Sequence, residues 1–174
     1  MPEAPSTAQP AGRRLGPLDV WLPVALVVLD QATKALVRAR IPLFESVTVL
    51  PVLNLAHVRN TGAAFGMLSD VDFPGKTALL AVIAAVAIVA MAFSLGWLAT
   101  TRLLTRVGLG LIIGGAAGNL IDRIWLGSVV DFVDVHWDTV HFWAFNVADA
   151  SITLGVASLI LDMMATHNDA SDPA

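Results

Sequence analysis

Two aspartates in this 174-residue sequence have the type and placing needed for acid–base chemistry. Asp131, in "SVVDFVDVHW", follows one apolar stretch, and Asp149, in "FNVAD", opens another. Two carboxylates brought together at low dielectric cannot easily both ionise, so they would share one proton. One would then act as a base and the other as an acid. This division suits peptide hydrolysis, in which a water is activated and a carbonyl oxygen is polarised.

Both aspartates also have structural explanations. Asp131 could be a capping or loop carboxylate. Asn146 stands three residues before Asp149, a spacing that resembles a capping box, and an acid in the first turn of a helix suits the helix dipole. Spacing alone leaves the structural and catalytic interpretations of Asp149 evenly balanced.

Further polar side chains interrupt the apolar stretches. Asp30 and Lys34 are four residues apart with the acid first, which favours an intrahelical ion pair that could brace the site. Asn119, Asp122 and Arg123 could reach one helical face. A buried Asn119 amide needs partners, whereas Arg123 could simply extend to the membrane interface. We expect Asp122 to pair with Arg123.

The composition indicates a single compact domain in a bilayer. The chain is 56% hydrophobic and 14% charged, with a mean hydropathy of +0.74, whereas a soluble domain is nearer about a quarter charged. A membrane helix needs roughly 20 mostly apolar residues, and the stretches that qualify are about 18–37, 77–99, 107–126 and 145–165.

Several classes of function are excluded by composition and spacing. The net charge of −4 and the lack of a basic cluster argue against nucleic-acid binding. The absence of Cys excludes disulfides, thiolate metal sites and a Cys nucleophile. The four histidines lack ligand spacing, so we expect no metal or other cofactor. Ser128 and Ser151 lack the "GxSxG" pattern of a serine hydrolase.

Four spans would place the links 39–76 and 127–144 on the same side of the membrane. We expect short strands in the first link, followed by the Gly-containing turn "RNTGAAFG". In the second link, Asp134 and Asp138 are expected to be solvated loop acids. The unusual polar residues thus converge at one end of the bundle, which indicates a functional site.

The distribution of Lys and Arg does not decide on which side of the membrane this end of the bundle lies. Trp125, Trp137 and Trp143 are typical of an interfacial aromatic belt.

The remaining sequence features concern helix packing and the N-terminal part of the chain. Gly110, Gly114 and Gly118 form a stripe that lets a neighbouring helix approach closely. Residues 1–17 have the composition of a disordered tail. The first span could instead belong to a signal peptide cut before Arg40, but the charges that interrupt it favour a retained helix.

Five sequence blocks together resemble lipoprotein signal peptidase, the signal peptidase II family. The resemblance covers residues 18–165 and implies an all-α membrane protein with four transmembrane helices and a small extracytoplasmic sheet and surface helix. It also implies a bacterial inner-membrane aspartyl endopeptidase that cuts prolipoproteins immediately before a Cys bearing diacylglycerol. The blocks are "DQATK" (30–34), "NTGAAFG" (60–66), "GNLIDR" (118–123), "VVDF" (129–132) and "FNVAD" (145–149).

The resemblance assigns roles to residues of this chain. It implies that Asp131 and Asp149 are the catalytic pair. Residues expected to bind substrate or support the site are Asp30, Lys34, Asn60, Gly62, Asn119, Asp122, Arg123 and Asn146. The expected partners are diacylated prolipoproteins and membrane lipid, and we expect a monomer. The membrane domain would be 18–166, with cytoplasmic tails at 1–17 and 167–174 and the site on the extracytoplasmic side.

Two other functions are compatible with buried polar groups in a membrane bundle. Intramembrane carboxylates also mark ion paths in transporters and proton relays. The sequence shows no inverted repeat and no acid within 77–99, which argues against a transporter. The polar residues could also serve only helix association in a non-catalytic adaptor.

Overall fold

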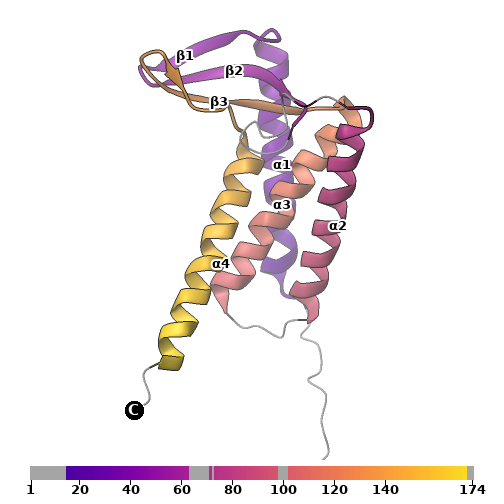
Figure 1. Ribbon diagram of the computed structural model, residues 1–174, viewed down its shortest axis with the longest axis vertical. Helices are drawn as coiled ribbons and strands as arrows, with labels where there is room; N and C mark the ends of the chain where they lie inside the picture. Colours follow the sequence, from indigo (N-terminus) through magenta and orange to yellow (C-terminus); the bar gives the residue numbers. More distant parts are fainter. Residues whose placement is uncertain (1–14, 63–70, 72, 98–101, 172–174) are drawn as a thin grey trace, which may run out of the picture.

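Four long helices form a bundle in the computed structural model, which describes residues 15–62, 71, 73–97 and 102–171 (Figure 1). Each is long and apolar enough to cross a membrane, as the hydropathy predicted. The helices are α1 (Pro17–Arg40), α2 (Lys76–Trp97), α3 (Leu103–Leu126) and α4 (Val147–Ser171).

Local sequence explains where these helices begin and end. α1 begins with Pro17, which suits a first turn, and Asp19 Oδ2 accepts the backbone N–H of Gly16 at 2.7 Å. α3 ends at Leu126, and Gly127, which follows it, has a φ of 68°, the left-handed conformation that glycine adopts readily. α4 continues to Ser171, so residues 167–171 of the predicted tail 167–174 extend this helix. The predicted disordered tail lies mainly in residues 1–14, outside the described part of the chain.

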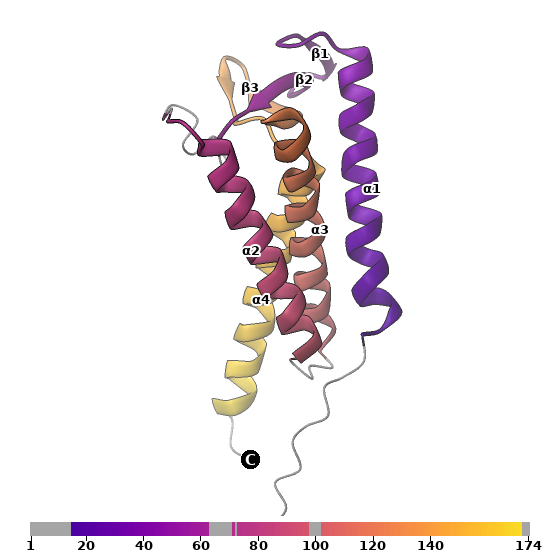
Figure 2. The same ribbon diagram turned by 90° about the vertical axis from the view of Figure 1, so that its right-hand side faces the viewer.

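α3 lies at the centre of the bundle and contacts all three other helices (Figure 2). Its glycines allow this close packing, as predicted. A Cβ added to Gly114 would lie 3.0 Å from the backbone of Pro23 in α1. A Cβ added to Gly118 would lie 2.5 Å from Oδ2 of Asp30. The glycine stripe thus brings the polar residues of α1 against α3.

An antiparallel sheet covers one end of the bundle (Figure 1). Its strands follow the order β1 (Ser46–Leu50), β2 (Leu53–Asn60), β3 (Val129–Trp137) and β4 (Val140–His141). The strands predicted in the link 39–76 are confirmed, whereas β3 and β4 replace what we expected to be a loop. Among residues 41–62, 71 and 73–75 no surface helix is present; residues 63–70 and 72 lie outside the described part.

A small apolar core fastens the sheet to the end of α1. It contains Val37 of α1 and Ile41, the residue that follows α1, together with Val130 and Phe132 from β3. Val130 is fully buried and Phe132 is 6% exposed. Because side chains alternate along a strand, Asp131 projects from the opposite face of β3. The core therefore fixes the position of this aspartate.

Candidate active site

Asp131 lies in β3 with only 2% of its surface exposed. Its Oδ1 accepts a hydrogen bond from the side-chain amide of Asn146 at 2.7 Å. Its Oδ2 accepts one from the amide of Asn60, at the end of β2, at 3.0 Å. This arrangement needs β2 and β3 to pair, and their register places Val58 opposite Asp131. The alternative that Asp131 is a loop carboxylate is therefore wrong, because it is a buried residue of a strand.

Asp149 lies in the first turn of α4. Its Oδ1 accepts a hydrogen bond from the side-chain amide of Asn119 at 2.8 Å. Its backbone N–H donates to Oδ1 of Asn146 at 2.9 Å, and its Oδ2 accepts the backbone N–H of Asn146 at 3.3 Å. The capping box that the spacing indicated is therefore present. Asn146, which is fully buried, bonds both aspartates, and we refer to Asp131 and Asp149 as the dyad.

Burial and the charge of Asp149 raise the pKa of Asp131 to about 7. Desolvation is the larger cause, because it penalises the ionised carboxylate. The hydrogen bonds from Asn60 and Asn146 act in the opposite direction, since they stabilise the ionised form. A carboxyl group that titrates near neutral pH is suited to take up and release a proton during a reaction.

Behind the dyad, α1 and α3 enclose a buried ion cluster. The ammonium of Lys34 lies 2.8 Å from Oδ2 of Asp30 and 3.1 Å from Oδ2 of Asp122. It also donates to Oδ1 of Asn119 at 2.9 Å. The side chains of Lys34, Asp30 and Asp122 are at most 1% exposed. The predicted Asp30–Lys34 pair is therefore present, and Asn119 connects it to Asp149.

The expectation that Asp122 pairs with Arg123 is wrong. Asp122 Oδ2 also accepts the backbone N–H of Val130 at 3.0 Å, and Oδ1 accepts the side-chain amide of Gln31 at 3.1 Å. Neighbouring residues on a helix point about 100° apart, so Asp122 faces α1 whereas Arg123 faces the turn after β2. Gln31, whose position in "DQATK" was its only sequence signal, is a member of the cluster that we did not predict.

Arg123 connects α3 to the backbone beside Asn60. Its guanidinium donates to the carbonyl oxygen of Gly62 at 3.0 Å and to that of Asn119 at 3.4 Å. The N–H of Gly62 donates to Oδ1 of Asn60 at 2.7 Å. Arg123 therefore holds the residue that orients Asn60, rather than only extending to the interface. The structure thus brings together all ten residues that the sequence assigned to the site.

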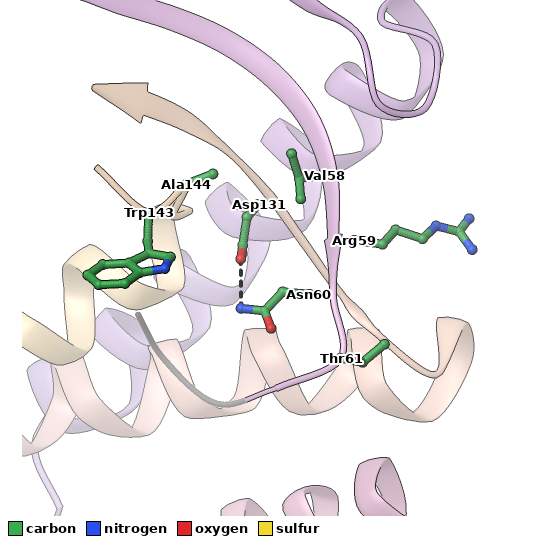
Figure 3. A pocket seen from close by; sticks show the side chains of 7 residues that line it. All are labelled: Val58, Arg59, Asn60, Thr61, Asp131, Trp143 and Ala144. Atoms are coloured by element: carbon green, nitrogen blue, oxygen red, sulfur yellow. Dashed lines mark hydrogen bonds between the residues drawn. The ribbon is translucent and has the colours of Figure 1, made fainter. Parts of the chain in front are cut away.

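A pocket of about 280 Å³ opens beside Asp131 (Figure 3). In this view, the side chains of Asp131 and Asn60 lie between the ring of Trp143 and Arg59, and the Arg59 side chain points away from them. Trp143 was predicted only as part of an aromatic belt, and no local motif marks it as a pocket residue. The lining residues are Val58, Arg59, Asn60, Thr61, Asp131, Trp143 and Ala144.

Among the described residues, the other acids of the second link lie in and after β3. Asp134, expected to be a solvated loop acid, lies in β3 and bonds Nδ1 of His141 at 3.0 Å and the amide of Asn54 at 3.2 Å. Asp138 is exposed in the turn after β3, as expected. Among the described residues, no three His, Asp or Glu side chains are grouped so that they could hold a metal ion.

The fold and the site together define a class of protein: a four-span membrane protein with a pair of buried carboxylates at one end of its bundle. The model of the signal peptidase (SPase) II family matches residues 22–165 of the chain. The chain therefore belongs to the signal peptidase II family.

Individual relatives agree with this assignment. The chain is 46% identical over 139 residues to the lipoprotein signal peptidase of Geobacter metallireducens, covering 79% of this chain and 85% of that protein. It is 42% identical over 151 residues to the lipoprotein signal peptidase of Pasteurella multocida, covering 86% and 90% respectively. The structure is similar to that of a bacterial membrane enzyme solved by the in meso method at 2.3 Å, with a TM-score of 0.82 and 30% identity over 94% of this chain and 97% of that one.

Proposed function

We propose that this protein is a membrane aspartyl endopeptidase that removes signal peptides from diacylated prolipoproteins, with Asp131 and Asp149 as its catalytic pair. The observation that carries this proposal is the hydrogen bonding of Asn146 to both aspartates, in a chain of the signal peptidase II family. The relatives' name, lipoprotein signal peptidase, supports the class of substrate.

The chemistry follows from the dyad sharing one proton. The ionised carboxylate takes a proton from a water, whose oxygen attacks the carbonyl carbon of the scissile peptide bond. The protonated carboxyl group gives its proton to the carbonyl oxygen, which forms a neutral tetrahedral diol. When the C–N bond then breaks, the proton taken from water passes from its carboxyl group to the leaving amine. One hydroxyl proton of the diol returns to the other carboxylate, which restores the shared proton of the dyad.

The other polar residues around the dyad would support this reaction without taking part in it. Asn60, Asn119 and Asn146 donate hydrogen bonds to the dyad. Gly62 and Arg123 hold Asn60 in place. Behind them, Lys34, Asp30 and Asp122 fix α1 against α3. We assign these residues to positioning and assign the bond-breaking steps to Asp131 and Asp149 alone.

The membrane placement belongs to the same proposal. The first residues of α1 and the last residues of α4 lie at the end of the bundle opposite the sheet (Figures 1 and 2). We assign that end to the cytoplasm and the sheet and dyad to the extracytoplasmic side of a bacterial inner membrane. The functional unit would be 18–166, acting as a monomer on substrates that are themselves held in the membrane by diacylglycerol.

A cleavage assay tests the function directly. The purified protein, reconstituted in lipid vesicles, is incubated with a diacylated prolipoprotein, and both products are identified by mass spectrometry. The expected product is a protein that begins with the lipidated Cys. Absence of cleavage by folded protein would overturn the proposal, and would direct attention to the proton-relay and adaptor alternatives.

A further inference from the structure

Strand β2 contains one residue more than β3 between two of their pairs. Three steps along β2 there correspond to two steps along β3, which is the pattern of a β-bulge. Ala56 and His57 of β2 together lie opposite the single residue Phe132 of β3. The pairs that flank the bulge are Leu55 with Val133 and Val58 with Asp131.

The burial of β2 follows this bulge. Side chains alternate between the two faces of a regular strand. Ala56 and His57 are consecutive, yet both are buried, with 7% and 6% of their surface exposed. The alternation therefore changes phase at His57.

The change of phase decides which side chain reaches Asp131. Val58 lies opposite Asp131, and Asn60, two residues further along β2, projects from the same face. The amide of Asn60 donates to Oδ2 of Asp131 at 3.0 Å, whereas the Arg59 side chain points away (Figure 3). If the register of Leu55 continued without the extra residue, Arg59 would turn to this face and Asn60 to the other.

His57 fastens the bulge to the segment that follows α1. Its backbone N–H donates to the carbonyl oxygen of Glu45 at 2.9 Å, and its own carbonyl oxygen accepts the N–H of Phe44 at 2.8 Å. Its ring nitrogen Nδ1 lies 2.8 Å from the carbonyl oxygen of Ile41. Because a carbonyl oxygen can only accept, Nδ1 carries the hydrogen and donates it.

The backbone of Phe44 is strained at this contact. Its φ of 68° lies in the left-handed region, which a bulky side chain rarely adopts. Its side chain is 75% exposed, so burial of the ring does not hold it there. Such a conformation persists only where surrounding contacts enforce it, and the bond from the Phe44 N–H to His57 is a contact of this kind.

The ring of His57 makes its polar contact through one nitrogen. Nε2 is buried and has no hydrogen-bond partner among the described residues. The bond from Nδ1 to Ile41 is thus the contact that a substitution can keep or remove.

We propose that His57 is a positioning residue for peptide cleavage, because it fixes the bulge that directs Asn60, and not Arg59, to Asp131. This assignment rests on the proposed function, and it adds a residue that lies outside the five sequence blocks. Asn60 remains the residue in contact with the dyad, and His57 acts through it.

Two substitutions of His57 separate its hydrogen bond from its bulk. The amide nitrogen in His57→Asn lies at the position of Nδ1 and can still donate to Ile41, whereas His57→Leu fills the space without a donor. With the full chain in lipid vesicles, His57→Leu should lower kcat about 10- to 100-fold with KM little changed. His57→Asn should keep kcat within a few-fold of the wild-type value. Equal kcat values in the two variants would overturn the proposal.

The route through Asn60 is tested by adding His57→Leu to Asn60→Ala. If His57 acts by directing the Asn60 amide, the second change should lower kcat scarcely further. The Tm should fall by a similar amount in both backgrounds, because the bond to Ile41 is lost in each. An equal fold-loss of kcat in both backgrounds would mean that His57 only supports the fold, and would overturn the proposal.

A second variant keeps the test decisive if His57→Leu does not fold. The amide in His57→Gln lies one bond further from the backbone, near the position of Nε2, and no longer meets Ile41. Its kcat should fall as predicted for His57→Leu. A kcat as high as that of His57→Asn would overturn the proposal.

His141→Leu serves as the control for a histidine of the same sheet. Its side chain is 53% exposed and lies beside Asp134, so its kcat should stay at the wild-type value. A loss as large as that of His57→Leu would show that the effect is not specific to the bulge, and would overturn the proposal. Failure of the proposed function gives a different result, because the wild-type protein would then cleave no diacylated prolipoprotein.

Discussion

At the residue scale, Asp131 and Asp149 should each be indispensable. Asp131→Asn and Asp149→Asn keep the shape of the side chain but can neither act as a base nor exchange the shared proton. We expect each variant to lose cleavage by roughly four orders of magnitude or more, and the double variant to be scarcely worse, because the two act as a unit. Turnover of a diacylated precursor by purified protein is the measurement.

Asp138→Asn is the matched control for these substitutions. Asp138 is exposed in the turn after β3, outside the network of the dyad, so its variant should cleave at the wild-type rate. Substantial cleavage by either dyad variant, measured beside an active control, would remove the aspartyl mechanism.

The raised pKa of Asp131 also predicts a stability effect. Between its ordinary value of 3.8 and its folded value of about 7, the folded state holds a proton more tightly than the unfolded state. The free energy of unfolding therefore falls as pH rises through this window, and the cost is complete above the folded pKa. Asp131→Asn removes this dependence.

Thermal unfolding in detergent at pH 4 and pH 8 tests this effect. We expect the variant's Tm to exceed the wild-type Tm by more at pH 8 than at pH 4, a stability gain at the expense of activity. A difference in Tm that is the same at both pH values would contradict the raised pKa.

The sequence blocks identified residues that the structure brings together around the dyad, but not all of their partners. Asp30 and Lys34 are neighbours on one helix, so a spacing rule found their ion pair. Asp122 and Lys34 meet only because α1 and α3 pack together, and spacing within α3 suggested the wrong partner, Arg123. Gln31 was missed for the same reason. Contacts between elements depend on packing that local spacing does not encode.

At the element scale, hydropathy predicted the four spans because length and apolar composition alone determine whether a helix can cross a bilayer. β3 was not predicted, because its residues pair with residues of β2 that lie about 70 to 80 positions earlier in the chain, and the segment 127–144 was interpreted only as a link between two spans. α1 supplies Asp30 and Lys34 to the site, which supports a retained helix over a cleaved signal peptide. Retention itself stays a prediction.

The close contact between α1 and α3 predicts that Gly118→Ala is disruptive. An added Cβ would lie 2.5 Å from Oδ2 of Asp30 and would displace that carboxylate from Lys34 and Ala148. We expect a loss of about 1 to 3 kcal/mol in stability together with reduced cleavage. Thermal unfolding and the cleavage assay measure the two effects.

Gly110→Ala is the matched control on the same stripe. Its added Cβ would lie 3.0 Å from Cδ2 of Leu22, the end of a flexible side chain that can move aside. Equal losses in Gly110→Ala and Gly118→Ala would mean that the contact with Asp30 is not what makes Gly118 necessary.

At the scale of the whole molecule, the proposed sidedness can be tested because the chain contains no Cys. Single cysteines are introduced by Asp138→Cys, at the sheet end, and His167→Cys, near the end of α4; both positions are exposed. With a membrane-impermeant maleimide added to intact spheroplasts, only Asp138→Cys should be labelled. His167→Cys should react after permeabilisation. Labelling of His167→Cys alone in intact spheroplasts would reverse the proposed topology.

The lipid on the substrate should determine how efficiently the site is reached. The dyad lies at the end of a membrane-spanning bundle, so a substrate anchored in the same bilayer is already concentrated at that depth. Each buried acyl CH₂ contributes about 0.8 kcal/mol to membrane binding, and a diacyl chain therefore holds the precursor where the pocket opens beside Asp131. An unlipidated precursor must reach the same site from water.

We therefore expect kcat/KM for a diacylated precursor to exceed that for its unlipidated counterpart by at least about a hundredfold. Both are compared at equal concentration with the protein in lipid vesicles. A third precursor carries an unrelated membrane-spanning helix in place of the diacylglycerol, which separates anchoring from recognition of the lipid. If anchoring is what matters, this precursor is cleaved almost as well as the diacylated one, whereas a rate as low as that of the unlipidated precursor means that the site contacts the diacylglycerol itself. Equal kcat/KM for lipidated and unlipidated precursors would show that substrate does not enter from the bilayer.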